Sequence, residues 1–212
     1  MPSETFNNLS HEKRKCIIQK CYEEFSQNSF REASISKIVS ELGIAKGSIY
    51  KYFKDKQDLY FYLIDRAAGT KLKAVEKAVE GKHDILWEIM QAGALFDIEN
   101  PLLTSFLNRV FSDSYVFEPD IRAQMIKRSC EFLMQYVKKA KERGTIRKDI
   151  DDRLIALFIN GILIGVGGML AALNGIDIDL YLSAVHESIE KKDELFSSLA
   201  DIYKLLMSGI AS

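Results

Sequence analysis

The chain has 212 residues, of which 47% are hydrophobic and 28% are charged, and it contains only three prolines. A chain of this length can bury a hydrophobic core without disulfide bonds, and its composition leans toward that of helical proteins, so an all-α fold is expected. The formal net charge of −1 excludes a strongly basic protein. Any surface that binds nucleic acid must therefore be local.

The cysteines and the start of the chain bear on its location. Cys16, Cys21 and Cys130 are odd in number and show no CxxC spacing, which argues against a disulfide framework and a zinc site. Residues 1–15 contain no apolar stretch behind a basic start, which argues against a secretory signal peptide. A cytoplasmic location is expected.

Helical patterns fill the first 80 residues. Apolar residues at Ile17, Cys21 and Phe25 predict an amphipathic helix from about Ser10 to Ser26. Ser34 can cap a second, short helix that ends at Gly43. A third helix is expected from near Ala45 to Phe53, and a fourth runs toward Val79 after a cap at Asp55 that Asp58 completes. Short helices joined by tight turns and followed by a long one indicate a helix-turn-helix.

The third helix carries the groups of functional interest. At 100° per residue, Ile49 and Phe53 share one face and are expected to point inward. Gly47 and Lys51 then point outward, flanked by Ser48 and Tyr50, so that a backbone, a cation, a hydroxyl and a phenol are presented together. Nearby lysines and the free N–H groups at the start of the fourth helix indicate phosphate contact. The alternative is a solvated basic face.

Residues from about Leu9 to Leu63 resemble the DNA-binding domain of the TetR family of bacterial transcriptional regulators. The resemblance is carried by Phe25, Phe30, Ser34, Ile38, Leu42-Gly43, Lys46-Gly47-Ser48, Tyr50, Tyr52-Phe53, Lys56 and Leu59. It implies that Lys46, Gly47 and Ser48 lie at the major groove, that Tyr50 and Tyr52 position the phosphate backbone, and that Lys56 contacts phosphate. The full set of expected DNA-binding residues is Ser34, Lys46, Gly47, Ser48, Tyr50, Lys51, Tyr52 and Lys56.

The sequence departs from the family pattern at two positions. Ser29 stands where a glycine usually follows the first helix, and we expect Asn28 to supply the left-handed residue instead. Ala45 stands where a Ser or Thr often begins the third helix, and loss of that cap costs about 1 kcal/mol of local helix stability.

The resemblance and the helix patterns divide the chain into a TetR-type helix-turn-helix domain, residues 8–68, and a helical ligand-binding and dimerisation domain, residues 69–212. About nine helices are expected in all. Those of the second part are expected at Asp84–Ile98, Leu102–Phe111, Glu118–Arg143, Asp151–Asn174 and Asp193–Ser208. Residues 175–192 are expected to be a loop, with room for a helical turn within it.

The segment Leu154–Leu173 is long and apolar enough to span a bilayer, and membrane anchoring is one reading of it. The other reading pairs it with the C-terminal helix and with the same two helices of a second copy in a four-helix bundle. Its four glycines indicate close helix crossing at a dimer interface, a kink, or space for a ligand. The resemblance favours the interface. The expected interface residues are Gly161, Gly165, Gly168, Leu199, Ile202 and Leu206.

Aromatic residues of the second part indicate a pocket for an apolar or flat molecule, with Asn160 as a polar anchor. The candidates are Trp87, Met90, Phe96, Phe106, Phe111, Tyr115, Phe132, Tyr136, Phe158 and Asn160, many of which would serve equally well as ordinary core. The three histidines lie far apart and neither HExxH nor GxSxG occurs. No catalytic residues, metal site or cofactor are therefore expected, and the chain is not expected to be an enzyme.

These observations predict a cytoplasmic homodimer that binds double-stranded, pseudo-palindromic operator DNA and stays off the membrane. A small apolar or aromatic effector is expected to release it, which makes repression the expected outcome. Half-sites repeat at about 34–36 Å, so a modest pivot through the fourth helix would prevent both copies from engaging DNA together. The alternative is a membrane-anchored DNA-binding protein that spans at residues 154–173.

Overall fold

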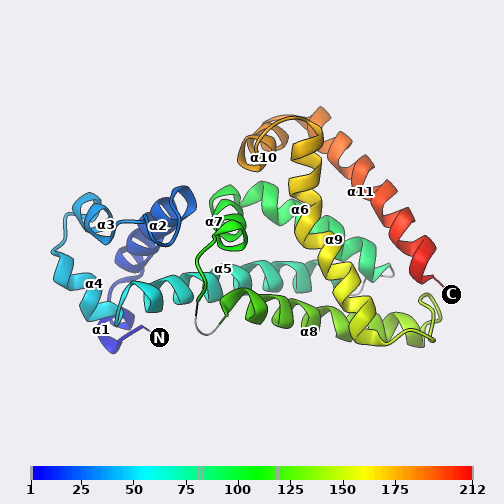
Figure 1. Cartoon of the computed structure of the whole chain (residues 1–212), viewed down its shortest axis with the longest axis horizontal. Coiled ribbons are helices and arrows are strands. Elements are labelled where there is room, and N and C mark those ends of the chain that lie inside the picture. The colour runs from blue at the N-terminus through cyan, green and yellow to red at the C-terminus, as the bar shows by residue number, and fades with distance from the viewer. Residues whose placement is uncertain (1, 81, 83, 118–119, 212) are drawn as a thin grey trace. The chain divides into compact units, whose positions relative to one another are not determined.

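A computed structural model describes residues 2–80, 82, 84–117 and 120–211. Within these residues the fold is all-α, as predicted, with eleven helices and no strand (Figure 1). The helices are α1 (Glu4–Asn7), α2 (His11–Gln27), α3 (Ile35–Leu42), α4 (Lys46–Tyr52), α5 (Lys56–Val79), α6 (Ile85–Glu99), α7 (Pro101–Ser112), α8 (Ile121–Glu142), α9 (Asp152–Leu173), α10 (Ile178–Glu187) and α11 (Ile189–Ile210).

Most helix ends follow from the capping residues identified in the sequence. Ser10 and Ser34 cap α2 and α3, with their side chains accepting from the backbone N–H of Lys13 and Lys37. Gly43 ends α3 at a φ of 64°, a left-handed conformation that glycine adopts without a steric cost. The short turn that follows places α4 directly after α3.

The start of α5 is held by the acidic box that the sequence predicts. Asp58 N–H donates to Asp55 Oδ1 at 2.8 Å, and Asp58 Oδ2 accepts from Lys54 N–H at 3.1 Å. The second bond reaches one residue further back than in the usual capping box. The box leads the chain from α4 into a helix of 24 residues.

Two expectations about local structure were incomplete or wrong. Helices α1 and α10 were not predicted, so the described residues form eleven helices where about nine were expected, and most of residues 175–192 are helical where a loop was expected. Helix α11 begins at Ile189, separated from α10 by Ser188 alone. Asn28 does not adopt the left-handed conformation, since its φ of −123° and ψ of 146° are extended. It ends α2 by another route: its Nδ2 and its backbone N–H both donate to Glu24 O.

The chain forms two compact units. The first contains Met1–Thr70 together with Leu102–Arg122, and the second contains Lys71–Pro101 together with Ala123–Ser212. The predicted division at residues 68 and 69 lies close to the first boundary. It does not anticipate that α7 and the segment after it join the N-terminal unit.

An aromatic core explains why α7 joins that unit. The Phe106 ring lies 5.1 Å from that of Tyr22 and 5.5 Å from that of Tyr60. The Phe117 ring packs 4.8 Å from Phe30 and stacks 5.4 Å from Tyr60. Burial of such rings dominates core energetics, so residues 102–122 complete the core that the helix-turn-helix stands on.

Polar contacts reinforce this packing. Asp113 is buried and its Oδ2 accepts from Phe30 N–H at 2.6 Å, while its Oδ1 accepts from Tyr115 N–H at 2.9 Å. Arg109 Nε donates to Ser26 O at 3.3 Å. The first of these bonds satisfies the Phe30 N–H in the connection between α2 and α3, where no helix supplies a partner, and the Arg109 bond reaches a carbonyl in the last turn of α2.

The second unit is a helical bundle in which α9 packs along one face only. Ile155, Ala156 and Ile159 are buried in a core shared with α8 and α11. Asn160, also buried, accepts from Ser129 Oγ at 2.5 Å through its Oδ1. A second apolar cluster packs α10 against α6, α9 and α11.

Candidate nucleic-acid interface

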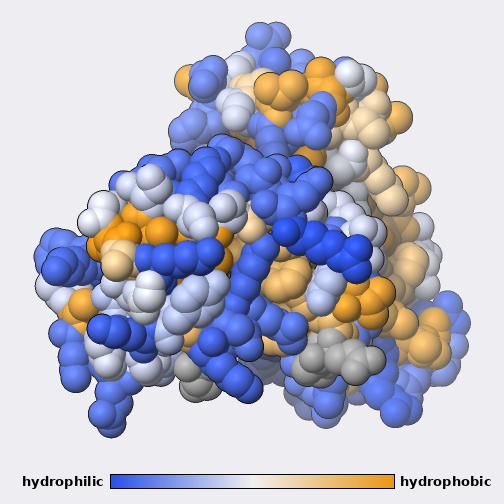
Figure 2. All heavy atoms as spheres, turned by 60° about the vertical axis from the view of Figure 1, so that its left-hand side comes forward, coloured by the Kyte–Doolittle hydropathy of each residue, from blue (hydrophilic) through white to orange (hydrophobic). Residues whose placement is uncertain are grey.

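Helix α4 is anchored on one face and open on the other, as the sequence predicts. Ile49 and Phe53 are 1% and 2% exposed. Lys46, Gly47 and Lys51 are exposed, and Tyr50 is 46% exposed despite its aromatic ring. Two buried anchors thus present a basic, hydroxyl-bearing face to the outside. Hydrophilic side chains predominate on the near side of the N-terminal unit in the space-filling view (Figure 2).

Gly47 has no structural reason, within the described residues, to be a glycine. It lies inside a helix, and a Cβ added to it would meet no atom within 4 Å. Glycine in a helix interior costs about 1 kcal/mol relative to alanine. A site where a phosphate or a base edge comes close to the backbone is the setting in which glycine is favoured.

Ser34 and the buried Glu24 brace α3 against α2. The backbone N–H of Ser34 donates to Glu24 Oε1 at 2.8 Å, and Lys37 Nζ lies 2.8 Å from Glu24 Oε2. Burial acts to raise the pKa of the Glu24 carboxyl, but the bonds from Lys37 and Ser34 outweigh it and lower the pKa below its usual 4.5. Glu24 was not among the residues expected from the sequence, because it lies ten residues from Ser34 and carries no motif of its own.

Lys56 is engaged inside the unit in this structure. Its Nζ donates to Ala33 O at 2.5 Å and to Arg31 O at 3.3 Å, and it lies 5.0 Å from the centre of the Phe30 ring. Partial burial lowers the pKa of Lys56, with Glu24 acting in the opposite direction. The side chain therefore ties the start of α5 to the end of the α2–α3 connection, next to the face expected to meet phosphate.

The remaining expected residues, Ser48 and Tyr52, are half-buried. The Tyr52 ring lies 5.6 Å from that of Phe6 in α1. The structure thus brings all eight expected DNA-binding residues into the first unit, on α3, α4 and the start of α5. The residues of α1, which contact α4, were missed because a single helical turn carries too few apolar positions to show a period.

The candidate ligand residues are divided between the two units. Phe106, Phe111 and Tyr115 lie in the first unit, where Phe106 is core and Tyr115 packs 4.9 Å from Phe30. In the second unit the Phe132 and Tyr136 rings lie 5.1 Å apart on α8, and Trp87 lies 5.5 Å from Tyr203. Met90 and Phe96 are buried, and Phe158 is 51% exposed. The candidates do not form a single lining.

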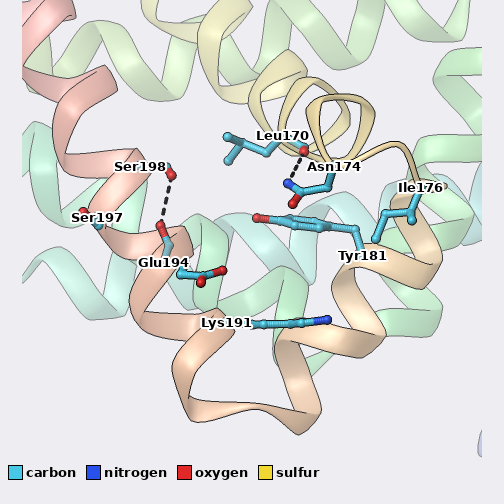
Figure 3. Close-up of a pocket in the computed structure, with 8 residues that line it drawn as sticks. All are labelled: Leu170, Asn174, Ile176, Tyr181, Lys191, Glu194, Ser197 and Ser198. Atoms are coloured by element: carbon cyan, nitrogen blue, oxygen red, sulfur yellow. Dashed lines mark hydrogen bonds between the residues drawn. The ribbon is translucent and has the colours of Figure 1, made fainter.

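A cavity of about 440 Å³ opens between α9, α10 and α11 in the second unit. Its lining is Leu170, Asn174, Ile176, Tyr181, Lys191, Glu194, Ser197 and Ser198. The Tyr181 ring lies between the side chains of Asn174 and Lys191, and Asn174 Nδ2 donates to Leu170 O at 2.8 Å (Figure 3). No aromatic ligand candidate lines this cavity, and five of its eight lining residues are exposed. The cavity is an open depression lined by both polar and apolar residues.

The expected dimer residues fall into two groups. Gly161 and Gly168 are exposed on α9 and a Cβ on either would meet nothing within 4 Å, while one on Gly165 would meet only the Met169 side chain. Leu199 and Leu206 are each 2% exposed and pack in the core of their own chain, and Ile202 is half-buried against the same core. Exposed apolar residues extend the glycine stripe along α9: Leu154, Leu157, Phe158, Ile164 and Met169.

No group of His, Cys, Asp and Glu side chains that could hold a metal ion is found among the described residues. Among the described residues, one helix, α9, has the length and the apolar composition needed to cross a membrane. The buried face of α9 within the bundle accounts for part of that apolarity.

Known proteins resemble this chain in both sequence and fold. Residues 17–63 match the family model for bacterial regulatory proteins of the tetR family. An HTH-type transcriptional regulator of Staphylococcus aureus is 31% identical over 96 residues, which are 43% of this chain and 51% of that protein. The chain thus spans about half the length of this curated relative.

The structural likeness extends over the whole chain. A TetR family transcriptional regulator from Chloroflexus aurantiacus is 26% identical, with a TM-score of 0.77 over 100% of this chain and 99% of that one. The fatty acid degradation regulator FadR from Bacillus halodurans shares the fold at 19% identity and a TM-score of 0.69. The match covers 92% of this chain and 98% of FadR. SmeT, the repressor of a multidrug efflux pump from Stenotrophomonas maltophilia, shares the fold at 13% identity and a TM-score of 0.67. The match covers 94% of this chain and 90% of SmeT.

Proposed function

The chain belongs to the TetR family of bacterial regulatory proteins, and we propose that it is a dimeric, cytoplasmic transcriptional repressor. In this proposal residues 8–68 bind a pseudo-palindromic operator, with α4 of each copy in successive major grooves. A small apolar or aromatic effector acting on residues 69–212 releases it. The exposed face of α4, with room for a Cβ at Gly47, is the observation that carries the proposal.

The roles at this face follow from what each group offers. Lys46 and Ser48 are proposed to read base edges, and Lys51 and Tyr50 to contact phosphate. Ser34 and Tyr52 are proposed to position the backbone. Lys56 is proposed to contact phosphate as well, although its ammonium already donates to Ala33 O and Arg31 O, so its structural share must be measured separately.

The test is selection of bound duplexes from a random pool, followed by affinity measurements at several salt concentrations. Lys51→Ala is expected to weaken all duplexes about equally and to reduce the salt slope, whereas Ser48→Ala is expected to change base preference. Uniform effects from both substitutions would contradict the division of roles. A wild-type chain that prefers no duplex at low salt would contradict the proposal.

Gly47→Ala separates DNA contact from folding. Because no atom obstructs a Cβ there, the substitution is expected to leave the unfolding free energy unchanged or raise it by about 0.5–1 kcal/mol. Duplex affinity is expected to fall by about tenfold or more, since the methyl group blocks close approach. Gly93→Ala in α6, where a Cβ also meets nothing within 4 Å, is the control that should leave affinity unchanged.

Dimerisation is proposed to use the apolar stripe of α9. Exposed apolar residues and glycines at helical spacing, from Leu154 to Met169, form one continuous face, and such a face is what a second copy would cover. Phe158→Glu is expected to convert dimers to monomers in analytical ultracentrifugation. Val116→Glu, at a residue 71% exposed outside α9, should not, and an unchanged Phe158→Glu dimer would rule out this face.

Effector binding is proposed to involve the aromatic side chains of the second unit, in particular Trp87, Phe132 and Tyr136, with Asn160 as the polar group. Trp87 is the single tryptophan of the chain, so its fluorescence reports on its own surroundings beside Tyr203 in the second unit. Titration with fatty acids and with flat aromatic compounds is expected to shift its emission and to lower duplex affinity over the same concentration range. A fluorescence shift without an affinity change would separate binding from regulation.

The second candidate is a membrane-anchored DNA-binding protein that spans at residues 154–173, and it is favoured only by the length and apolarity of α9. If α9 spanned a membrane, Asn160 would lose its contact with Ser129. Asp152 would lose its ion pair with Lys141, in which the Lys141 Nζ lies 2.6 Å from the Asp152 carboxylate. Alkaline washing of membranes distinguishes the two. Recovery of the chain in the supernatant excludes anchoring, and retention in the pellet would favour it.

A further inference from the structure

Helix α4 depends on other parts of the chain for its orientation. It has seven residues, and its N-cap, Ala45, makes no side-chain hydrogen bond. Isolated helices of this length are unstable because nucleation is costly, and the last four carbonyls of any helix lack intrahelical partners. Contacts made by the rest of the unit therefore decide the direction in which the exposed face of α4 points.

Ser3 supplies partners for the last carbonyls of α4. Its backbone N–H donates to Tyr52 O at 2.9 Å, and its Oγ–H donates to Lys51 O at 2.7 Å. The same hydroxyl oxygen accepts from Phe6 N–H at 3.3 Å and so caps α1. One residue therefore joins the beginning of α1 to the end of α4, and the two helices lie side by side (Figure 1).

Phe6 strengthens the same junction by burial. Its side chain is 1% exposed, and its ring lies 5.6 Å from Tyr52, 5.0 Å from Phe53 and 5.9 Å from Tyr62. Arg14 Nη1 of α2 donates to Asn7 O at 2.9 Å and holds the other end of α1. Helix α1 is thus fixed to α2, α4 and α5 at once.

We propose that Ser3 and Phe6 form a positioning element that sets the orientation of α4 for sequence-specific DNA recognition. The inference rests on the proposed DNA binding and assigns both residues an action through α4, without contact to DNA. The Lys51 carbonyl is bonded to Ser3 while the Lys51 side chain lies on the exposed face. A shift at this junction therefore moves the groups that meet the duplex.

Two substitutions in the full-length chain loosen the junction from different sides. Ser3 has a φ of −70°, which proline matches, so Ser3→Pro removes both donors without a change of φ. Phe6→Ala removes the buried ring. Ser3→Ala, which removes only the hydroxyl, and Phe6→Leu, which keeps an apolar side chain, are milder variants that keep the test valid should the stronger ones not fold.

Ser10→Ala is the matched control. Ser10 caps α2 as Ser3 caps α1, with its Oγ accepting from Lys13 N–H at 3.3 Å, but it makes no described bond to α4. This variant removes the same chemistry from the same unit. Its effects therefore measure general destabilisation.

Hydrogen exchange of the α4 amides and duplex affinity are measured for each variant. In Ser3→Pro and Phe6→Ala the α4 amides are expected to exchange about tenfold faster or more, with α8 unchanged. Affinity for the selected duplex is expected to fall by about tenfold, while affinity for a random duplex and its salt slope stay constant, because phosphate contacts tolerate a reoriented helix.

Two results would overturn the proposal. The first is unchanged α4 exchange in every Ser3 and Phe6 variant, and the second is an equal loss of specific affinity in Ser10→Ala. Exchange is measured in the free protein, so it tests the junction even if the wild-type chain binds no duplex. A wild-type chain that binds no duplex would contradict the proposed function, while the exchange rates would still show whether Ser3 and Phe6 hold α4.

Discussion

Glu24 holds the helix-turn-helix together although it never reaches the exposed face. The carboxylate is 5% exposed and bonds both to the Ser34 backbone N–H and to Lys37 Nζ. A buried charge is tolerated only when such partners are present. Because those bonds favour the ionised form, the pKa of Glu24 is lower in the folded chain than its ordinary 4.5.

The lowered pKa gives Glu24 a pH-dependent share of stability. A depressed carboxyl pKa stabilises the fold above the unfolded value, and this contribution is lost as pH falls through the folded pKa. We expect Glu24→Gln to lower the unfolding free energy by about 2 kcal/mol at pH 7 and by less below pH 4.5. Urea denaturation at both pH values measures this, with exposed Glu12→Gln as control. A pH-independent difference would contradict the assignment.

Tyr60 presents the opposite situation in the same core. Its ring packs against Phe25, Phe30, Phe106 and Phe117, yet its hydroxyl is buried without a hydrogen-bond partner among the described residues. Burial raises the pKa of Tyr60, and the nearby Asp113 adds to the rise. An unsatisfied buried hydroxyl costs about 1–3 kcal/mol.

Tyr60→Phe is therefore expected to leave the unfolding free energy unchanged or to raise it by about 1 kcal/mol. Tyr22→Phe is the matched control, because the Tyr22 hydroxyl donates to Leu63 O at 3.0 Å, and its loss should destabilise the chain. Chemical denaturation of both variants tests the contrast. Destabilisation of equal size in both would show that the Tyr60 hydroxyl has a partner in solution.

Helix α4 begins without a side-chain cap. Ala45 sits at its N-cap with a φ of −69° and a ψ of 143°, the extended geometry of a capping residue, but has no side chain to cap with. Ala45→Ser is expected to stabilise the chain by about 1 kcal/mol, and Ser34→Ala, which removes the existing cap of α3, to destabilise it by a similar amount. Thermal denaturation measures both changes. A neutral Ala45→Ser would mean that the start of α4 is already satisfied by water.

At the level of the folded chain, the N-terminal unit is not continuous in sequence. Residues 102–122 belong to it through Phe106, Phe117 and the bonds of Asp113. A change in the connection that carries α7 therefore acts directly on the core beneath α3. Within the first unit, Asp113 thus gives a direct route of contact from the segment after α7 to the connection between α2 and α3.

Asp113→Ala tests this route. Loss of the carboxylate leaves the Phe30 N–H buried and unpaired, so we expect a loss of about 1–3 kcal/mol in the unfolding free energy and faster hydrogen exchange at the Phe30 amide. Asp113→Asn, which keeps one acceptor, should lose less, and exposed Ser114→Ala should change neither quantity. Unaltered hydrogen exchange at Phe30 in Asp113→Ala would show that the bond from Phe30 N–H to Asp113 does not join residues 102–122 to the connection between α2 and α3.

Local chemistry made most of the fold predictable. Ser34, Gly43 and Asp55 cap or end helices as the sequence predicts, and α2 and α9 begin next to Ser10 and Asp151, where their starts were expected. Capping depends on a few neighbouring residues, which makes it predictable from sequence. The inward face of α4 followed from the spacing of Ile49 and Phe53 alone. The family match at residues 17–63 lies in the region where this local pattern is densest.

Contacts between residues distant in sequence could not be predicted in this way. The Ser3 bonds to α4, the Glu24 brace, the Lys56 bonds to Ala33 and Arg31, and the docking of residues 102–122 all join segments whose separation leaves no periodic trace. Leu199 and Leu206 have the same chemistry as Leu205, yet the first two are 2% exposed and the third is 73% exposed. Apolar spacing shows that a helix has a face to bury, and only packing in three dimensions determines what covers it.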